Sequence, residues 1–177
     1  MTVSDPAGMD PAWEARIEDI WRSAPSMAPA ELVQSIDTLA RERPDGDALA
    51  LFERACARDT AGMEAQAEPL YRAALATGAL DEYRRARANI QLGSTLRALG
   101  RLDESERLLK AELDRHLEPG HPATLHDEAR AIMALTYLAQ GRAIDAAGLL
   151  LNTLGPHLSR YQRTVATHAS RWTGATW

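Results

Sequence analysis

Two arginines and a serine in the middle of the chain stand at spacings that bring them to one side of a helix. Arg87, Ser94 and Arg97 occupy positions i, i+7 and i+10, so a helix through them presents all three on a common face. Guanidinium groups beside a hydroxyl are well suited to bind a carboxylate. The pattern therefore predicts contact with a peptide C-terminus or with a segment rich in aspartate and glutamate.

A second interpretation of the same stretch is a solvated helix face. Arg84, Arg85 and Arg87 follow Asp81 and Glu82 closely in the sequence. Opposite charges three or four residues apart on a helix form weak surface pairs. On this interpretation the arginines are balanced within their own helix and the face binds no ligand.

Other residue types that support chemistry do not form a catalytic pattern. The chain has no glycine-rich phosphate loop, no Gly-x-Ser-x-Gly elbow and no His-Glu-x-x-His motif. The single cysteine, Cys56, has no histidine nearby in the sequence and is interpreted as a small hydrophobic residue on a helix face. We therefore predict no enzymatic activity and no cofactor.

Histidines and acidic residues raise the question of a metal site. Glu112 and His116 stand at i and i+4, and His121 and His126 flank the start of the next segment. Zinc usually needs three or four converging ligands, whereas this spacing fixes only one pair. We interpret the histidines as loop and surface residues and predict no metal.

Composition narrows the class of protein. The chain has 177 residues, 45% of them hydrophobic, a net charge of -5 and one cysteine, which is typical of a globular protein without an internal disulfide. The acidic balance argues against a general nucleic-acid binder. No apolar run approaches the roughly 20 residues of a membrane helix, and no signal peptide is apparent. We expect a cytoplasmic protein with neither a nucleic-acid nor a membrane partner.

Alanine occurs 33 times, whereas valine and isoleucine are rare, and this bias predicts an all-α fold. Glycine and proline punctuation divides the chain into about nine helices. They are expected at about residues 13–21, 32–41, 48–57, 63–76, 81–99, 103–117, 124–139, 143–154 and 157–172. We divide the chain into an N-terminal extension with one short amphipathic helix (1–29), three helix pairs (30–154), and a C-terminal capping helix with a short tail (155–177).

Three glycines mark an internal repeat. Aligning Gly62, Gly100 and Gly141 places a small residue five positions after each glycine and a large apolar residue four positions further on. Two antiparallel helices approach closely only where small side chains meet. The predicted packing positions are Ala55, Leu92, Gly93 and Ala134 on the first helices, and Ala67, Ser105 and Ala146 on the second, with Tyr71, Leu109 and Leu150 as the large residues.

The stretch from Asn89 to Glu112, NIQLGSTLRALGRLDESERLLKAE, resembles a tetratricopeptide repeat. That repeat has Trp-x2-Leu-Gly-x2-Tyr on its first helix and Ala-x3-Phe on its second. The stretch keeps the Leu-Gly pair and the turn glycine, with Asn89, Leu96 and Ser105 at other signature positions. With AEPLYRAALATG, it makes residues 30–154 similar to the bacterial group-5 tetratricopeptide repeat family. The resemblance implies a right-handed superhelical array of antiparallel helix pairs, an α-α solenoid.

The resemblance also implies a function. Such arrays are protein–protein interaction modules, scaffolds or adaptors that hold a peptide or partner in a concave groove. The residues that it assigns to the groove are Phe52, Cys56, Asp59, Arg87, Gln91, Ser94, Arg97, Glu128, Leu135 and Leu138. We expect a protein or peptide partner with an acidic segment, and a module that is a monomer or weak homodimer. The alternative is a small-ligand or peptide sensor of a regulatory system.

The last predicted helix has one apolar face. Leu158, Tyr161, Val165, Ala169 and Trp172 recur at helical spacing. We expect this face to be buried and the helix to cap the end of the array.

Overall fold

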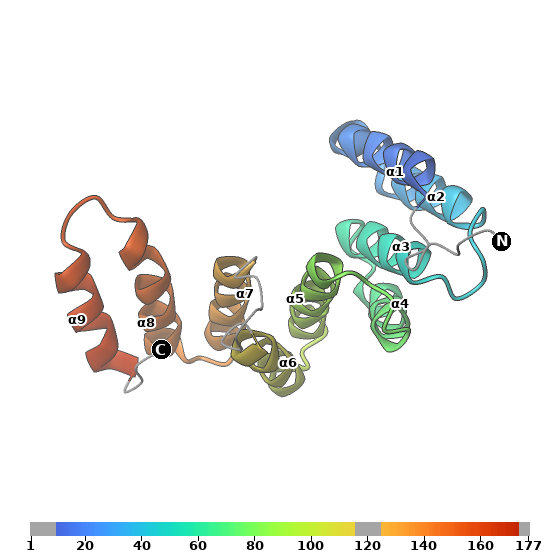
Figure 1. Cartoon of the computed structure of the whole chain (residues 1–177). Helices are drawn as coiled ribbons and strands as arrows, with labels where there is room; N and C mark the ends of the chain where they lie inside the picture. Colours follow the sequence, from blue (N-terminus) through green and yellow to red (C-terminus); the bar gives the residue numbers. More distant parts are fainter. Residues whose placement is uncertain (1–9, 116–124, 174–177) are drawn as a thin grey trace. The chain divides into compact units, whose positions relative to one another are not determined.

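The described residues, 10–115 and 125–173, form an all-α fold, seen in the computed structural model of Figure 1. Within these ranges no strand is present, and the all-α prediction is confirmed. The helices are α1 (Pro11–Ser23), α2 (Pro29–Ala40), α3 (Ala48–Thr60), α4 (Glu64–Ala76), α5 (Glu82–Ala98), α6 (Leu102–Arg115), α7 (His126–Ala139), α8 (Ala143–Leu154) and α9 (Gln162–Thr173), with short 3₁₀ turns η1 (Ala24–Ser26) and η2 (Gly155–His157). No described helix is both long enough and apolar enough to cross a membrane.

The chain separates into two compact units, residues 1–85 (unit 1) and 86–177 (unit 2). The boundary falls within α5, which differs from the division expected at residues 29 and 154. Each unit is described below by itself.

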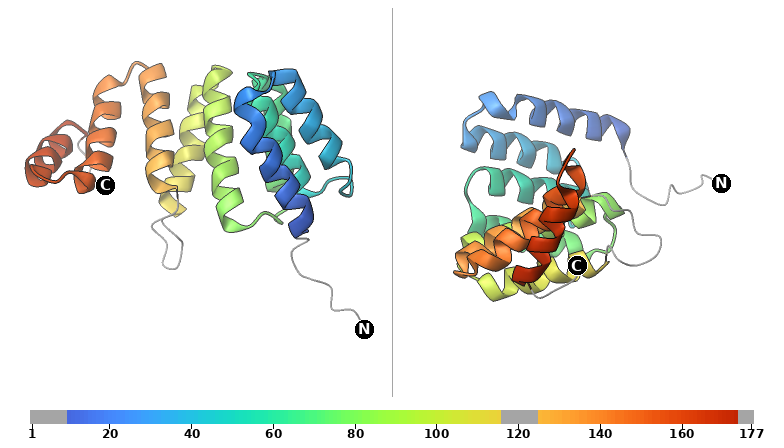
Figure 2. Two further views of the ribbon diagram at one scale, coloured as in Figure 1. Left: turned by 90° about the horizontal axis from the view of Figure 1, so that it is seen from above. Right: turned by 90° about the vertical axis from the view of Figure 1, so that its left-hand side faces the viewer.

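Unit 1 begins with a helix pair. Trp13 and Ile17 of α1 are buried against Leu32, Ile36 and Leu39 of α2, and the Trp13 indole Nε1 donates to the Leu39 carbonyl oxygen at 3.0 Å. Figure 2 shows α1 running beside α2, and α3 beside α2. The N-terminal helix is therefore part of the unit 1 core.

A second pair, α3 and α4, completes the core of unit 1. Ala55 and Ala67 are both fully buried, which is consistent with a close approach of the two helices. The rings of Phe52 and Tyr71 pack with centroids 6.4 Å apart and a 57° interplanar angle. The Tyr71 hydroxyl donates to the Asp59 carboxylate at 3.4 Å.

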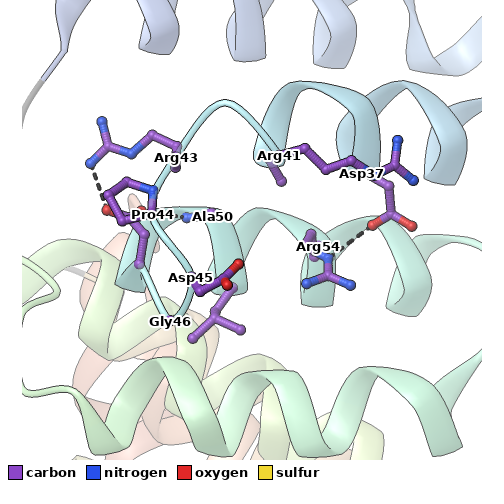
Figure 3. A pocket seen from close by; sticks show the side chains of 11 residues that line it. Asp37, Arg41, Arg43, Pro44, Asp45, Gly46, Ala50 and Arg54 are labelled. Atoms are coloured by element: carbon purple, nitrogen blue, oxygen red, sulfur yellow. Dashed lines mark hydrogen bonds and ion pairs between the residues drawn. The ribbon is translucent and has the colours of Figure 1, made fainter.

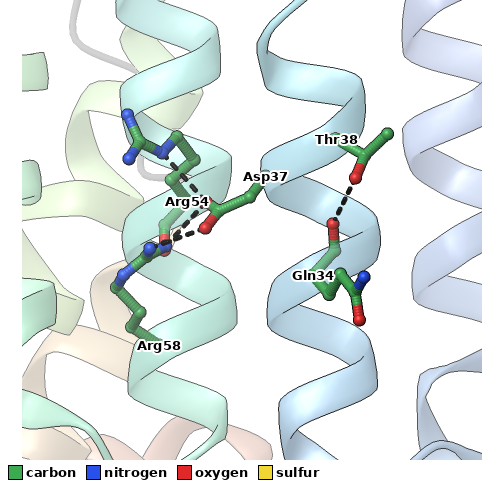
Figure 4. A network of polar contacts seen from close by, with 5 residues as sticks. All are labelled: Gln34, Asp37, Thr38, Arg54 and Arg58. Atoms are coloured by element: carbon green, nitrogen blue, oxygen red, sulfur yellow. Dashed lines mark hydrogen bonds and ion pairs between the residues drawn. The ribbon is translucent and has the colours of Figure 1, made fainter.

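An ion-pair network joins α2 to α3, as Figure 4 shows. Arg58 donates to the two carboxylate oxygens of Asp37 at 2.9 and 2.8 Å, and Arg54 Nε donates to Asp37 at 3.0 Å. Burial alone would raise the pKa of Asp37, but the hydrogen bonds from Arg58 and Arg54 outweigh it and lower that pKa. Asp37 therefore stabilises the folded state in its ionised form.

We expect Asp37→Asn to lower the free energy of unfolding by about 1–3 kcal/mol at pH 7, since hydrogen bonds to charged groups contribute about that much. A folded-state pKa below the unfolded value of about 3.9 gives stability that is present above pH 4 and lost as pH falls through the folded pKa. The gap between wild type and variant should therefore close in thermal melts at progressively lower pH. Asp19→Asn, at an exposed pair with Arg22, is the matched control. Equal effects of the two substitutions would contradict the prediction.

The turns after Gly62, Gly100 and Gly141 have the same hydrogen bonds. The three glycines have φ of 70°, 76° and 77°, a left-handed conformation that glycine adopts without strain. In each turn the residue after the glycine donates to the carbonyl five positions before it: Met63 to Arg58 at 2.8 Å, Arg101 to Leu96 at 2.9 Å, and Arg142 to Tyr137 at 2.8 Å. This is the 6→1 bond of a Schellman motif. The turn glycines thus occupy equivalent places in three helix pairs.

Unit 2 has a small-residue crossing between α5 and α6. The Ser105 hydroxyl donates to the Gly93 carbonyl oxygen at 2.7 Å, and Ser105 Oγ lies 2.9 Å from Thr136 Oγ1 of α7. A Cβ atom on Gly93 would lie 2.7 Å from Leu109 Cγ. The neighbouring core consists of Leu109, Met133, Ala134, Tyr137, Ala146 and Leu149.

Two details of the expected packing are wrong. Leu150 is 41% exposed, while Leu149 is buried with Ala146. Ala146 and Leu149, three positions apart, lie on the buried face of α8. The next residue, Leu150, lies about 100° further around the helix and therefore faces away from the core. Tyr161 is 75% exposed because α9 begins only at Gln162, and Tyr161 precedes it in a left-handed conformation with φ of 66°.

Helix α9 packs against α8 through part of the predicted face. Ala169 is fully buried, and Leu158 and Val165 are half-buried. The Trp172 side chain lies outside the described residues. The buried face of α9 is thus narrower than the sequence pattern predicts.

Candidate functional site

The predicted arginine face lies on α5. This helix starts where the Asp81 carboxylate accepts the Arg84 backbone N–H at 2.8 Å, which satisfies one of the free donors of the first turn. Ile90, Leu92, Leu96 and the small residues around them are buried. The carboxylate-binding candidates Arg87, Gln91, Ser94 and Arg97 are half-buried. We call these four residues the α5 face.

Arg97 differs from the other cations of its helix. Its Nη2 donates to the Ser94 hydroxyl at 3.3 Å, and its Nε is shielded from water with no hydrogen-bond partner in the described ranges. A shielded donor without an acceptor costs free energy. The structure thus brings Ser94 and Arg97 together and leaves the Arg97 guanidinium without a carboxylate partner among the described residues.

Arg84 and Arg85 belong to a balanced surface, as the second interpretation of the sequence expected. Arg84 pairs with Asp81 and with Glu14, both at 2.6 Å, and Arg85 pairs with Glu82 at 2.6 Å. These two arginines are therefore committed within unit 1, whereas Arg97 has no carboxylate within ion-pair distance among the described residues of unit 2.

A second candidate face lies on α7. Leu135 and Leu138 are 44% and 49% exposed, one helical turn apart. Glu128 is exposed at the first turn of the same helix. Apolar side chains grouped on a surface often mark binding sites. The α7 residues of the expected groove are thus accessible to a partner.

The residues expected from the first repeat do not form an open surface. Phe52 is fully buried and Cys56 is 2% exposed, so the expectation that they line a groove is wrong. Both lie against Tyr71 of α4, inside the helix pair. Asp59, a half-buried residue of unit 1, accepts the Tyr71 hydroxyl. The sequence alone did not distinguish the inner side of the pair from its outer side.

Glu112 has a structural role that the sequence analysis missed. It is 2% exposed, and its carboxylate accepts the Asn89 side-chain amide at 2.7 Å. The available signal was Asn89, a polar residue at the tryptophan position of the repeat. No group of three or more histidine, cysteine or acidic residues suited to a metal occurs in the part of the chain that the structure describes. His116 and His121 lie outside that part.

Comparison with known proteins agrees with the repeated turns and helix pairs. Residues 48–172 match the tetratricopeptide repeat family, and the chain belongs to this family. Two crystal structures of nearly identical TPR-like repeats, from a Podospora anserina protein described as a putative kinesin light chain, have the same fold. The first covers 97% of this chain and 90% of its own, with a TM-score of 0.66 and 16% identity. The second, a single-substitution variant of the same repeats, covers 98% and 90% at the same score and identity. No curated protein sequence matches the chain.

Proposed function

We propose that the protein is a non-catalytic interaction module of the cytoplasm, and that unit 2 binds an acidic segment of a partner protein. Tetratricopeptide repeats generally present extended surfaces to protein partners. The observation that carries the proposal is Arg97, a half-buried arginine that pairs with the Ser94 hydroxyl and with no carboxylate in the described ranges. A partner carboxylate would accept charge-assisted hydrogen bonds from the terminal nitrogens of this guanidinium.

The α5 face and the α7 face define the chemistry of this partner. Arg87, Ser94 and Arg97 offer two positive charges and a hydroxyl, while Leu135 and Leu138 offer exposed apolar surface. A segment that carries carboxylates together with one or two apolar side chains would complement both. We therefore expect an acidic peptide with leucine-like anchors to bind better than an acidic peptide alone.

The test is binding of labelled acidic peptides, with and without apolar residues, measured by fluorescence anisotropy. The double variant Arg87→Glu/Arg97→Glu should weaken binding about 30-fold or more, since losing one partner of a shielded charge pair costs about 2–5 kcal/mol. Binding of the wild type should also weaken with salt, because exposed charges are screened beyond about 8–10 Å.

A matched control has the same net charge as the double variant Arg87→Glu/Arg97→Glu. Arg107 and Arg163 are exposed residues of unit 2, on α6 and α9, and Arg107→Glu/Arg163→Glu should leave binding nearly unchanged. Circular dichroism should show the same helical content for both double variants. Equal loss of binding in the two would show nonspecific charge attraction and would overturn the assignment to the α5 face.

A further inference from the structure

A polar pocket lies in unit 1 where α2 ends and α3 begins, apart from the residues assigned to the partner. Figure 3 shows it between the end of α2, the turn at residues 41–47 and the first turns of α3. Its volume is about 130 Å³. Since a water molecule takes roughly 30 Å³ of liquid, the pocket has about the volume of four water molecules, which suits a ligand of a few non-hydrogen atoms.

Two arginines of the pocket have donors to spare. Arg41 is exposed, and its guanidinium makes no hydrogen bond or ion pair with the described residues. Arg54 uses Nε to reach Asp37 at 3.0 Å, while its two terminal nitrogens have no acceptor in the described ranges. Arg43, by contrast, pairs with Asp47 at 2.7 Å and lies over the Trp13 ring at 5.1 Å. Arg41 and Arg54 are thus the groups that can receive an anion.

One carboxylate of the pocket is also available. Asp37 is held by Arg54 and Arg58, and Asp47 by Arg43. Asp45, exposed in the turn, has no ion pair or hydrogen bond with any described residue. Figure 3 shows its carboxylate extending from the turn on the side where Arg54 lies. The pocket therefore offers a cation-binding group together with two anion-binding groups.

The balance of charge selects the class of ligand. Three arginines and three aspartates line the pocket, and Arg58 adds one positive charge where it pairs with Asp37, so the site neutralises a dianion such as phosphate only in part. A small molecule with one carboxylate and one ammonium matches the available groups. Ala40, Ala50 and Leu51 form the apolar part of the wall, which suits a short aliphatic side chain.

We propose that this pocket binds a small α-amino acid as its zwitterion. The ligand carboxylate accepts hydrogen bonds from Arg41 and Arg54, and its ammonium group donates to Asp45. Because both the carboxylate and the ammonium group of the ligand make charge-assisted hydrogen bonds, binding depends on both groups. The residues of this site lie in unit 1, and those of the proposed acidic-peptide site lie in unit 2.

The experiment is a titration of the full chain with glycine and with alanine, followed by amide chemical shifts in NMR spectra. We expect saturable shifts at residues 41–47 and 51–54. Acetate, which lacks the ammonium, and glycinamide, which lacks the carboxylate, should each bind at least about ten-fold more weakly, one charged contact being worth about that factor or more. Inorganic phosphate is the third comparison and should bind no better than acetate.

Two conservative variants test the assigned groups. Arg41→Gln and Asp45→Asn change exposed side chains, so the fold should persist, and each should weaken glycine binding about ten-fold or more. Arg22→Gln, at an exposed arginine of α1 outside the pocket, should leave binding unchanged. Absence of saturable shifts would overturn the proposal. Acetate or phosphate binding as tightly as glycine, or indifference to Asp45→Asn, would also overturn it.

Discussion

Replacing Gly93 by leucine is expected to lower the free energy of unfolding by about 3 kcal/mol or more. A Cβ at this position would lie 2.7 Å from Leu109 Cγ and 2.8 Å from Leu109 Cδ2. Leu109 is fully buried, so it has little room to move away, and overpacking a dense core typically costs about 1–3 kcal/mol, occasionally more. Thermal melts should show a fall of about 2–4 °C for each kcal/mol.

Controls for this prediction separate overpacking from helix propensity. Alanine is a better helix former than glycine by about 1 kcal/mol, so Gly93→Ala would stabilise the protein if the site had space. We expect Gly93→Ala to lower the free energy of unfolding less than Gly93→Leu does, or to leave it without an increase. Ala98→Leu adds a similar volume at an exposed position of α5 and should change stability by no more than about 0.5 kcal/mol.

A double-mutant cycle identifies the atoms responsible. Leu109→Ala alone should cost about 2–5 kcal/mol. Combined with Gly93→Leu it should cost less than the sum, because the smaller residue vacates the space that the new side chain needs. Additive effects, or an unchanged melting temperature in Gly93→Leu, would show that Gly93 does not lie at the crossing of α5 and α6.

The turns were predictable from sequence because their chemistry is local. A left-handed residue at a helix end strongly favours glycine, so Gly62, Gly100 and Gly141 reveal the repeat before any contact is known. Helix starts were also readable, as at Asp81, whose carboxylate caps α5. Most helix bounds accordingly fall within two or three residues of expectation, and α8 matches its predicted range, 143–154.

Positions that depend on neighbouring helices were harder to predict. Phe52 and Cys56 have the same helical spacing whether they face a groove or Tyr71, and only the packing of α3 on α4 decides between them. Leu149 and Leu150 are identical in type, so the sequence could not show which one faces α7. Tyr161 fits the apolar face of α9 only if the helix begins earlier than it does.

The candidate site was predicted in type but not in detail. The spacing of Arg87, Ser94 and Arg97 was sufficient to suggest a carboxylate-binding face. The difference between Arg84 and Arg97 was not visible, because it depends on Glu14, seventy positions away from Arg84 in the sequence and 2.6 Å away in space. The pocket at the α2–α3 turn escaped notice for the same reason, since Arg54 and Asp45 come together only in the folded chain.

Replacing Tyr71 by alanine is expected to cost about 3–5 kcal/mol, the range for removing a large buried aromatic side chain. Tyr71 is fully buried and its ring packs on Phe52. Tyr71→Phe keeps the ring and loses only the 3.4 Å hydrogen bond to Asp59, so it should cost no more than about 1.5 kcal/mol at pH 7. Denaturant unfolding of both variants separates the ring from the hydroxyl. Equal costs would mean that the hydrogen bond dominates.

Wild type and Tyr71→Phe are also expected to differ in their stability at alkaline pH. Burial, together with the nearby Cys56 and Asp59, raises the pKa of Tyr71 far above its ordinary value near 10. The hydroxyl therefore stays protonated in the folded chain, whereas an unfolded tyrosine ionises above about pH 10. The contribution of the protonated Tyr71 hydroxyl to the free energy of unfolding is fully present below pH 10 and is lost as pH rises further. Wild type should thus lose stability between pH 9 and pH 11 more steeply than Tyr71→Phe, and parallel losses in the two proteins would show that Tyr71 is accessible to ionisation in the folded state.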